Sequence, residues 1–449
     1  MAKKLVKSVY LGLLKMLAKL EMAKHKDTTI IGITGSSGKT SCKEAVVAFL
    51  MPHVKNALKY TVKGNSETGI PYEILDIPVR HYKIWQYPFI LLRGLLHVLF
   101  TYKKYSTFVI EYGIDGPEAP LNMDYLLSIV KPHIGVLLSI SSVHGENFEK
   151  DLDASIPQAK RVSVIETAIA HEKFKLLLAI QDKKKAFLTK QAADFLQPIE
   201  YEDMTIIDDI AIPSVTSIEN TAEGAIVTLQ MSKQEITAQL PEIALTQSSR
   251  RNIQFAAVVT SHLKKDIATS FSQLPKNYHM GPGRSTLLPG NDGTIILDSS
   301  YNANPFAAKE LFPLVKELAK QGKRKKIIVL GDFRELGENT PTIYAEVIKE
   351  AVKVADILVL TNNMMKEYGI SVAEQAGMVL NENMYWFENG KQLSFHINEV
   401  IEQNAVVLFE GSQNTVFLEY AVKELCSNKD PAYIKTHIAR MSNDWLEIK

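Results

Sequence analysis

Short apolar runs alternate along the chain with longer segments of helical periodicity, and this pattern predicts an α/β protein. Strands are predicted near residues 29, 108, 133 and 186, with helices between them, which indicates a central parallel sheet. Residues 205–240 contain short alternating runs, such as AIVTLQ and EITAQL, that predict a small antiparallel sheet flanking the main one.

After about Pro275 a second alternation of strands and helices begins, and it is typical of a Rossmann-like domain. Strands are predicted at residues 294–298, 326–331, 357–361 and 406–410, and helices at 305–321, 344–354 and 416–425. We therefore expect a basic N-terminal helix (1–28), a central domain on a parallel sheet (29–275), and a C-terminal Rossmann-like α/β domain (276–449).

The first 26 residues carry seven lysines against Glu21, and their apolar residues recur at helical spacing. Those apolar residues are Leu5, Val9, Leu13, Met16, Leu17 and Leu20. The lysines interrupt the apolar run and no small-residue cleavage site follows it, which argues against a membrane span and against a signal peptide. Two interpretations stay open: a helix packed on the domain, or a helix lying on an anionic membrane.

A second apolar stretch, residues 84–100, is broken by Pro88, Arg93 and His97. It is too short for a comfortable membrane span of about 20 residues. Its leucines and aromatic residues form either a helix that faces the core, which we favour, or an exposed patch that joins the N-terminal helix in contacting lipid.

Charge and cysteine content narrow the class of protein. The 51 lysine and arginine residues nearly balance the 50 aspartate and glutamate residues, which leaves a net charge of +1 and no global field to attract nucleic acid. Cys42 and Cys426 are the only cysteines, too few for a disulfide framework or a zinc ribbon. We expect a cytoplasmic protein without a nucleic-acid partner.

The order of strand, glycine-rich loop and helix at residues 29–50 predicts a phosphate-binding site. Glycines let backbone N–H groups approach phosphate oxygens, and the helix N-terminus adds a partial positive charge. Lys39 is expected to neutralise the β and γ phosphates of ATP or GTP, and the Thr40 hydroxyl to hold Mg²⁺. The loop residues expected to bind nucleotide are Gly35, Ser36, Ser37, Gly38, Lys39, Thr40 and Ser41.

The loop ITGSSGKTS (33–41) resembles the compact phosphate loop of the Mur ligases, and further motifs agree over residues 29–425. The motifs are GNSETGIPYEIL (64–75), FVIEYG (108–113), SVHGENF (142–148), GPGR (281–284), DSSYNANP (298–305), GDFRELG (331–337) and EGSQNTVFLE (410–419). Two of them, DSSYNANP and GDFRELG, resemble the branch that adds D-alanyl-D-alanine to a muramyl tripeptide.

The resemblance implies an ATP- and Mg²⁺-dependent amide ligase of peptidoglycan synthesis. In that family the γ-phosphate moves to a carboxylate of a muropeptide acceptor, and a D-amino acid or dipeptide amine attacks the resulting acyl phosphate. The transfer develops negative charge, which metal ions and fixed cations stabilise.

The resemblance also implies the residues of the catalytic centre. Lys39, Glu111 and His144 match its catalytic positions, with Glu111 and His144 as magnesium ligands beside Thr40. The family uses a lysine carbamylated by carbon dioxide as a further magnesium ligand. Two lysines match that position, Lys173 and Lys160, and we prefer Lys173 because its whole helical segment fits.

Further residues match nucleotide- and substrate-binding positions of the family. Asn252, Arg284 and Asp298 are implied to contact the nucleotide. Asn65, Asn302 and Asn304 are implied to contact substrate.

The sequence departs from the family at Arg251 and Ser299, where many relatives have histidine and aspartate. It also departs at Glu410 and Gln413, where many relatives have lysine and arginine. Only about 28 residues precede the phosphate-loop strand, so we expect no UDP-binding domain of normal size. These departures leave two alternatives open. One is a ligase with a lipid-linked or non-murein acceptor, peripheral at the inner membrane face. The other is a nucleotide-binding scaffold or regulatory subunit that needs a protein partner.

Overall fold

The computed structural model describes residues 2–54, 57–101, 103–142, 145–150, 156–334, 336–412 and 416–441. The chain forms two compact units, each described here by itself. The first consists of Met1–Ser214 with Arg251–Asn277, and the second of Val215–Arg250 with Tyr278–Lys449.

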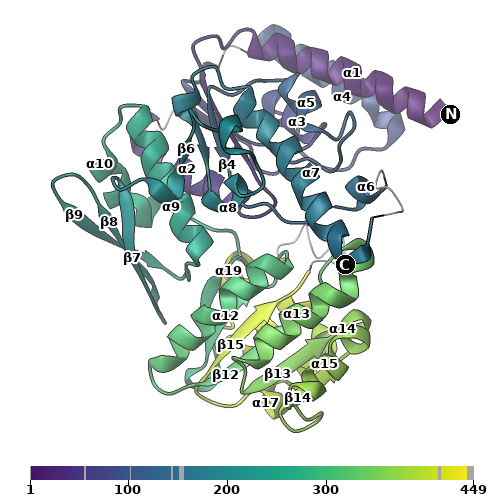
Figure 1. Ribbon diagram of the computed structural model, residues 1–449, viewed down its shortest axis with the longest axis vertical. Helices are drawn as coiled ribbons and strands as arrows, with labels where there is room; N and C mark the ends of the chain where they lie inside the picture. Colours follow the sequence, from purple (N-terminus) through teal and green to yellow (C-terminus); the bar gives the residue numbers. More distant parts are fainter. Residues whose placement is uncertain are drawn as a thin grey trace. The chain divides into compact units, whose positions relative to one another are not determined.

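A six-stranded parallel sheet in the order β2-β3-β1-β4-β5-β6 forms the centre of the first unit (Figure 1). Its strands are β1 (Thr29–Thr34), β2 (Leu58–Tyr60), β3 (Thr107–Glu111), β4 (Ile134–Leu137), β5 (Ala186–Leu188) and β6 (Thr205–Ile206). The register pairs Ile33 with Glu111 and Thr34 with Leu137. Because the strands are parallel, the loops that follow β1, β3 and β4 meet at one edge of the sheet.

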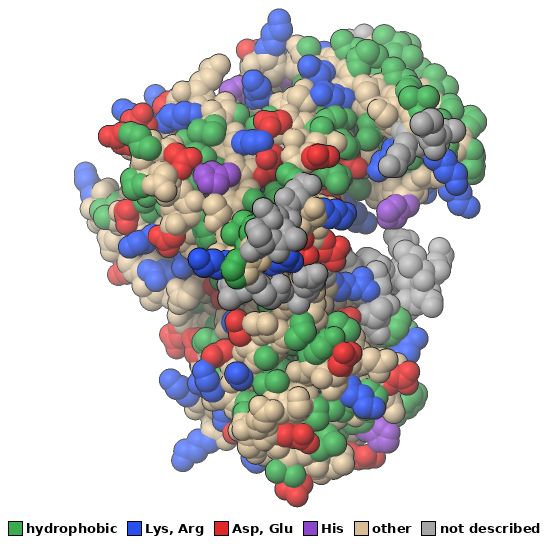
Figure 2. Space-filling view, turned by 45° about the vertical axis from the view of Figure 1, so that its right-hand side comes forward, with side chains coloured by type: hydrophobic (Ala, Val, Ile, Leu, Met, Phe, Trp, Pro, Cys, Tyr) green, Lys and Arg blue, Asp and Glu red, His purple; other side chains and the backbone are tan. Residues whose placement is uncertain are grey.

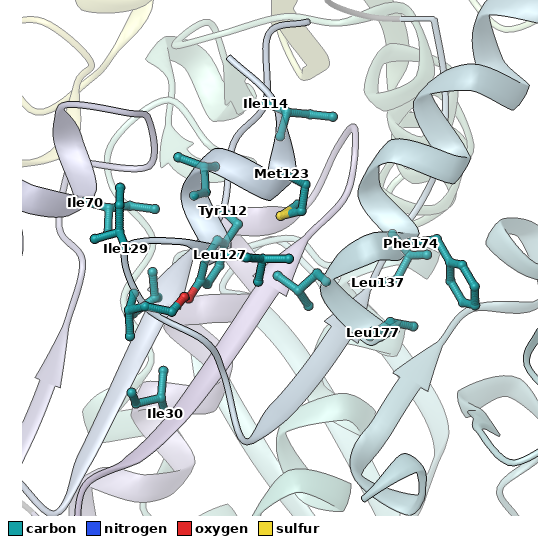
Figure 3. Packing of buried hydrophobic residues seen from close by; sticks show 14 of the residues in the cluster. Ile30, Ile70, Tyr112, Ile114, Met123, Leu127, Ile129, Leu137, Phe174 and Leu177 are labelled. Carbon is teal, nitrogen blue, oxygen red and sulfur yellow. The ribbon is translucent and has the colours of Figure 1, made fainter. Parts of the chain in front are cut away.

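Helices cover this sheet, and their apolar faces meet the strands in one core. The helices are α1 (Ala2–Met22), α2 (Lys39–Val54), α3 (Gly69–Ile74), α4 (Tyr87–Phe100), α5 (Met123–Leu127), α6 (Glu146–Glu149), α7 (Gln158–Leu178), α8 (Lys190–Ala193), α9 (Gln247–His262), α10 (Ile267–Ser272) and α11 (Leu274–Asn277). Figure 3 shows part of the core, in which Phe174 and Leu177 of α7 lie beside Leu137 of β4. Tyr112, directly after β3, is fully buried and donates its hydroxyl to the Val130 carbonyl.

The second unit is built on a six-stranded sheet in the order β10-β11-β15-β12-β13-β14, parallel except for β10 at its edge. Its strands are β10 (Thr286–Pro289), β11 (Ile295–Ser299), β12 (Lys325–Leu330), β13 (Ile357–Thr361), β14 (Met384–Phe387) and β15 (Ala405–Glu410). Its helices are α12 (Pro305–Lys320), α13 (Thr340–Val352), α14 (Asn363–Tyr368), α15 (Ile370–Gln375), α16 (Gly390–Phe395), α17 (Ile397–Val400), α18 (Leu418–Leu425) and α19 (Pro431–His437). The predicted α/β class, with two successive α/β sheets, is confirmed.

The small antiparallel sheet belongs to another unit than we expected. Its strands are β7 (Ser214–Thr221), β8 (Gly224–Gln230) and β9 (Glu235–Pro241). The sequence placed it in the central domain, whereas its contacts are with the second unit. The reason is the buried Asn220 at the end of β7. Its backbone and side-chain N–H groups donate to Glu317 of α12 at 2.9 and 3.0 Å.

The outcome differs between the two apolar N-terminal segments. For residues 1–28 the interpretation of a helix packed on the domain is confirmed, because Tyr10, Leu14 and Leu17 of α1 join the core of the first unit. The stretch at 84–100, for which we favoured a core-facing helix, forms a short 3₁₀ turn (Ile84–Gln86) and α4, and α4 buries only Ile90 and Gly94. Most of its apolar side chains are exposed.

Candidate functional site

The predicted phosphate loop connects β1 to α2 at the sheet edge where parallel strands end. Gly38 has φ 81°, a backbone conformation that glycine adopts without strain. At Gly35 a side chain is excluded by space as well, because an added Cβ would lie 2.7 Å from the Leu138 Cβ. The loop therefore brings its backbone close to β4 and directs the first N–H groups of α2 outward, as an anion site requires.

Hydrogen bonds hold this loop against the segment that follows β4. The Ser36 N–H donates to the Ser139 carbonyl at 2.7 Å. The Ser36 hydroxyl donates to the Ser141 carbonyl and accepts from the Ser141 N–H, both at 3.0 Å. This segment continues toward His144, the expected magnesium ligand, which lies outside the described residues.

Lys39 is the first residue of α2 and lies over the loop. Its ammonium group donates to the Gly35 carbonyl at 2.8 Å and to the Ser36 carbonyl at 3.3 Å. Desolvation lowers the pKa of Lys39, and the negative charges of Glu111 and Asp115 partly oppose that shift. Ser37 and Ser41 are half-buried in the loop and in the first turn of α2. The Lys39 cation thus lies against the loop that is expected to bind phosphate.

Two of the predicted magnesium ligands meet at the end of β3. The Thr40 hydroxyl donates to one oxygen of the buried Glu111 carboxylate at 3.1 Å. The Asn65 side-chain amide donates to the other oxygen at 3.0 Å. In the part of the chain that the structure describes, no three His, Cys, Asp or Glu side chains gather as a metal cluster. A hydroxyl beside one carboxylate fits Mg²⁺, which takes its other oxygens from phosphate and water.

Lys173 of α7 is buried, and its neighbours are those of this centre. Desolvation is the largest of the effects that hold the pKa of Lys173 well below its usual value, and the positive charge of Lys39 lowers it further. Asp115, Glu111 and Glu172 act in the opposite direction. Lys160, the alternative, is exposed near the start of α7. Of the two candidate lysines, Lys173 therefore has the buried environment that lowers the pKa of its amine and so favours the neutral form.

Asn252 of α9, expected near the nucleotide, lies beside the phosphate loop. Its side chain is buried, and its amide nitrogen is 3.8 Å from the position of a Cβ added at Gly38. The neighbouring Arg251 points elsewhere and pairs with Asp208 at 3.1 Å. The first unit thus brings together the loop, Asn65, Glu111, Lys173 and Asn252.

In the second unit, the expected nucleotide and substrate residues follow β11. Asp298 is buried at the end of that strand, its carboxylate accepts from the Ser300 N–H at 3.0 Å, and burial raises its pKa to about 6. Asn304 accepts from the Ala307 N–H at 2.9 Å and so caps α12. Asn302 is exposed in the same loop. The Arg284 guanidinium lies 4.6 Å from the centre of the Tyr301 ring.

Glu410, one of the departures from the family pattern, ends β15 next to this loop. It is fully buried and pairs in register with Ser299 of β11. Burial raises the pKa of Glu410 to about 8, so the side chain is mainly protonated at neutral pH. Gln413, another departure, lies outside the described residues.

Sequence reasoning did not identify three charged residues that act on the candidate site: Asp115, Glu172 and Arg440. Asp115 and Glu172 both act on the pKa of Lys173. Arg440 donates to the Ser300 and Tyr301 carbonyls at 2.9 and 2.8 Å and pairs with Glu419 at 2.8 Å. Asp115 follows Glu111 by four residues and Glu172 precedes Lys173, so proximity in sequence was an available signal for those two. For Arg440, 140 residues from Ser300, there was none.

Known proteins are similar to this chain in sequence and in fold. Residues 283–413 match the family model "Mur ligase, glutamate ligase domain". The UDP-N-acetylmuramoyl-tripeptide–D-alanyl-D-alanine ligase of Borreliella burgdorferi is 24% identical over 389 residues, which cover 85% of this chain and 72% of that protein.

Two solved structures have the same fold. MurF from Acinetobacter baumannii superposes with a TM-score of 0.69 at 19% identity, over 92% of this chain and 80% of the other. MurF ligase from Thermotoga maritima in complex with ADP gives 0.67 at 19% identity, over 92% and 83%. The chain therefore has the fold of these MurF structures, its residues 283–413 match the model of the Mur ligase glutamate ligase domain, and its sequence is similar to that of a D-alanyl-D-alanine ligase.

Proposed function

We propose that this chain is an ATP- and Mg²⁺-dependent ligase that joins D-alanyl-D-alanine, or a similar amine, to a muropeptide precursor in peptidoglycan synthesis. The observation that carries the proposal is the joint placement of Lys39, Thr40, Glu111 and Lys173 around one phosphate loop. A nucleotide-binding scaffold has no need of a carboxylate and a neutral buried lysine beside that loop.

The residues present account for the steps that such a ligase performs. The N–H groups of the loop and of α2 orient the phosphates of ATP, and Lys39 balances the charge that develops as the γ-phosphoryl group leaves. Thr40 and Glu111 would hold Mg²⁺, which would supply Lewis-acid stabilisation of the negative charge on the transferred phosphoryl group. Asn65 donates a hydrogen bond that orients the Glu111 carboxylate.

Lys173 supplies a further anionic group once it reacts with carbon dioxide. The neutral amine attacks the carbon atom, a C–N bond forms, and one proton leaves to solvent, so that a neutral side chain becomes a carbamate. A carbamate close to the Lys39 cation is favoured electrostatically, and its oxygens suit a hard cation. His144 would belong to the same centre.

The substrates and the location form part of the proposal. The relatives carry names that specify UDP-linked muramoyl tripeptide and D-alanyl-D-alanine, and the retained loop residues Asn302 and Asn304 support a related pair here. Cys42 and Cys426 are both buried and unpaired, which suits a reducing cytoplasm. A location at the inner membrane face is also part of the proposal.

Mass spectrometry of the products tests this function. The protein is incubated with ATP, Mg²⁺, bicarbonate, UDP-muramyl-tripeptide and D-alanyl-D-alanine, beside Lys39→Ala and the exposed control Lys233→Ala. An ATP-dependent pentapeptide is expected, reduced at least about 100-fold in Lys39→Ala and unchanged in the control. ATP binding without product from this acceptor, or from a lipid-linked one, would instead identify a scaffold.

A further inference from the structure

Helices α1 and α4 lie side by side in the first unit and run in the same direction (Figure 1). The Tyr10 and Tyr87 rings stack with centroids 3.8 Å apart. Seven residues further along α4, a Cβ added at Gly94 would lie 3.2 Å from a Leu17 methyl group, so glycine favours the close approach. The two helices therefore form one rigid layer, and the direction of each outward face is fixed.

The outward face of α1 carries an apolar stripe that the core does not use. Its members are spaced by three or four residues and are 40–66% exposed: Leu5, Val9, Leu13, Met16 and Leu20. A surface helix ordinarily presents polar side chains to water at these positions. Tyr10, Leu14 and Leu17 already supply the inward face, so the stripe is a second apolar face on the same helix.

The 3₁₀ turn before α4 and α4 itself repeat this arrangement. Their outward stripe has the same spacing and is 46–66% exposed: Trp85, Phe89, Leu92, Leu96 and Leu99. Figure 2 shows apolar side chains gathered at the upper right of the view, over the end of the first unit that carries α1 and α4. An apolar area of this extent on a folded protein marks a binding surface. We call the two stripes together the α1–α4 face.

The charges around the α1–α4 face are mainly positive; the nearby acids Glu67 and Asp76 pair with Lys7 at 3.9 Å and with Lys59 at 2.7 Å. Residues 77–110 contain two arginines and three lysines and no aspartate or glutamate. The single acid within α1, Glu21, is buried and accepts hydrogen bonds from Lys24 and His25 at 2.8 and 3.1 Å. Lys3 and Lys19 of the same helix are exposed. The rim is therefore cationic, and the partner that complements it is anionic.

We propose that the α1–α4 face binds the surface of an anionic lipid bilayer. An apolar stripe bordered by lysines and arginines, with tryptophan at its edge, is the composition of helices that lie in the plane of a membrane interface. A second copy of the chain would oppose two cationic rims and is disfavoured. None of the helices among the described residues has the length and apolar character to cross a bilayer, so the contact is peripheral. The proposal goes beyond the ligase activity and does not rest on it.

Co-sedimentation of the full chain with vesicles tests this face. One set contains phosphatidylglycerol and phosphatidylcholine, and the other contains phosphatidylcholine alone. The wild type is expected to sediment with the anionic vesicles only, less so at high salt, with a blue shift of Trp85 fluorescence. The double variant Phe89→Ser with Leu96→Ser should weaken binding by about tenfold or more, because both side chains are exposed and lose apolar contact with lipid.

The matched control removes apolar side chains that are more exposed than Phe89 and Leu96 but lie elsewhere: Ile199→Ser with Phe395→Ser, positions that are 76% and 83% exposed. Equal thermal unfolding of both double variants shows that folding is intact. Absence of binding to anionic vesicles, or equal binding of wild type and Phe89→Ser/Leu96→Ser, overturns the proposal. A dimer in solution that the same double variant dissociates assigns the face to a second copy and also overturns it.

Discussion

Lys173 is a buried lysine close to a second cation, Lys39, and its pKa is held well below the usual value. The variant Lys173→Met cannot form the proposed carbamate, but it keeps the apolar stem and about the volume of the lysine side chain. We expect ligase activity to fall at least about 100-fold in this variant, while the exposed Lys160→Met stays near wild type. Carbon-13 NMR with labelled bicarbonate should show a carbamate signal that only Lys173→Met abolishes. Full activity of Lys173→Met would refute the assignment.

Glu410 makes stability depend on pH in a defined direction. Its pKa is about 8 in the folded protein and near 4.5 when exposed, so folding takes up a proton between these values. The free energy of unfolding should therefore fall as pH rises from about 4.5 to about 8, and Asp298, with a pKa of about 6, adds to the fall at the acid end. Glu410→Gln should remove the dependence between about pH 6 and 8.

Urea unfolding at a series of pH values measures this effect, with the exposed Glu388→Gln as the control for loss of one charge. The control should follow the wild-type curve. Parallel pH profiles for wild type and Glu410→Gln would show that the buried carboxyl is ionised and paired in the folded protein.

At the scale of elements, the phosphate loop contains two glycines that are needed for different reasons: Gly38 for its backbone conformation and Gly35 for lack of space. Gly38→Ala has room for its Cβ, whose nearest atom is a Leu138 methyl at 3.6 Å, and costs only the strain of φ 81°, about 1 kcal/mol. Gly35→Ala adds a contact of 2.7 Å with Leu138 and must displace the loop. ATP affinity, measured by calorimetry, should fall more for Gly35→Ala than for Gly38→Ala. The reverse order would mean that α2, and not the loop backbone, governs binding.

The local hydrophobic pattern was sufficient to predict those strands and helices whose burial is decided by their own residues. The strand predicted at 357–361 is β13, Ile357–Thr361, buried throughout, and Glu111 was placed correctly at the end of a buried strand. The pattern could not show which side of the helix at 87–100 faces the core, because its partner, α1, comes from residues 2–22. The edge strands β2 and β14 were missed because they are short and half-exposed.

At the scale of the whole molecule, the division into units depends on a contact that no local pattern contains. Asn220 and Glu317 are 97 residues apart, and the hydrogen bonds between them hold β7 against α12. Asn220 also accepts a hydrogen bond from the Leu245 N–H at 2.8 Å. Asn220→Ala leaves the Leu245 N–H without its side-chain acceptor and removes the side-chain hydrogen bond to Glu317, which costs about 1–3 kcal/mol. The second unit should unfold at lower urea concentration while the first still binds ATP. Glu219→Ala, exposed on the same strand, should change neither. Loss of ATP binding together with the second unit would mean that the two units unfold as one.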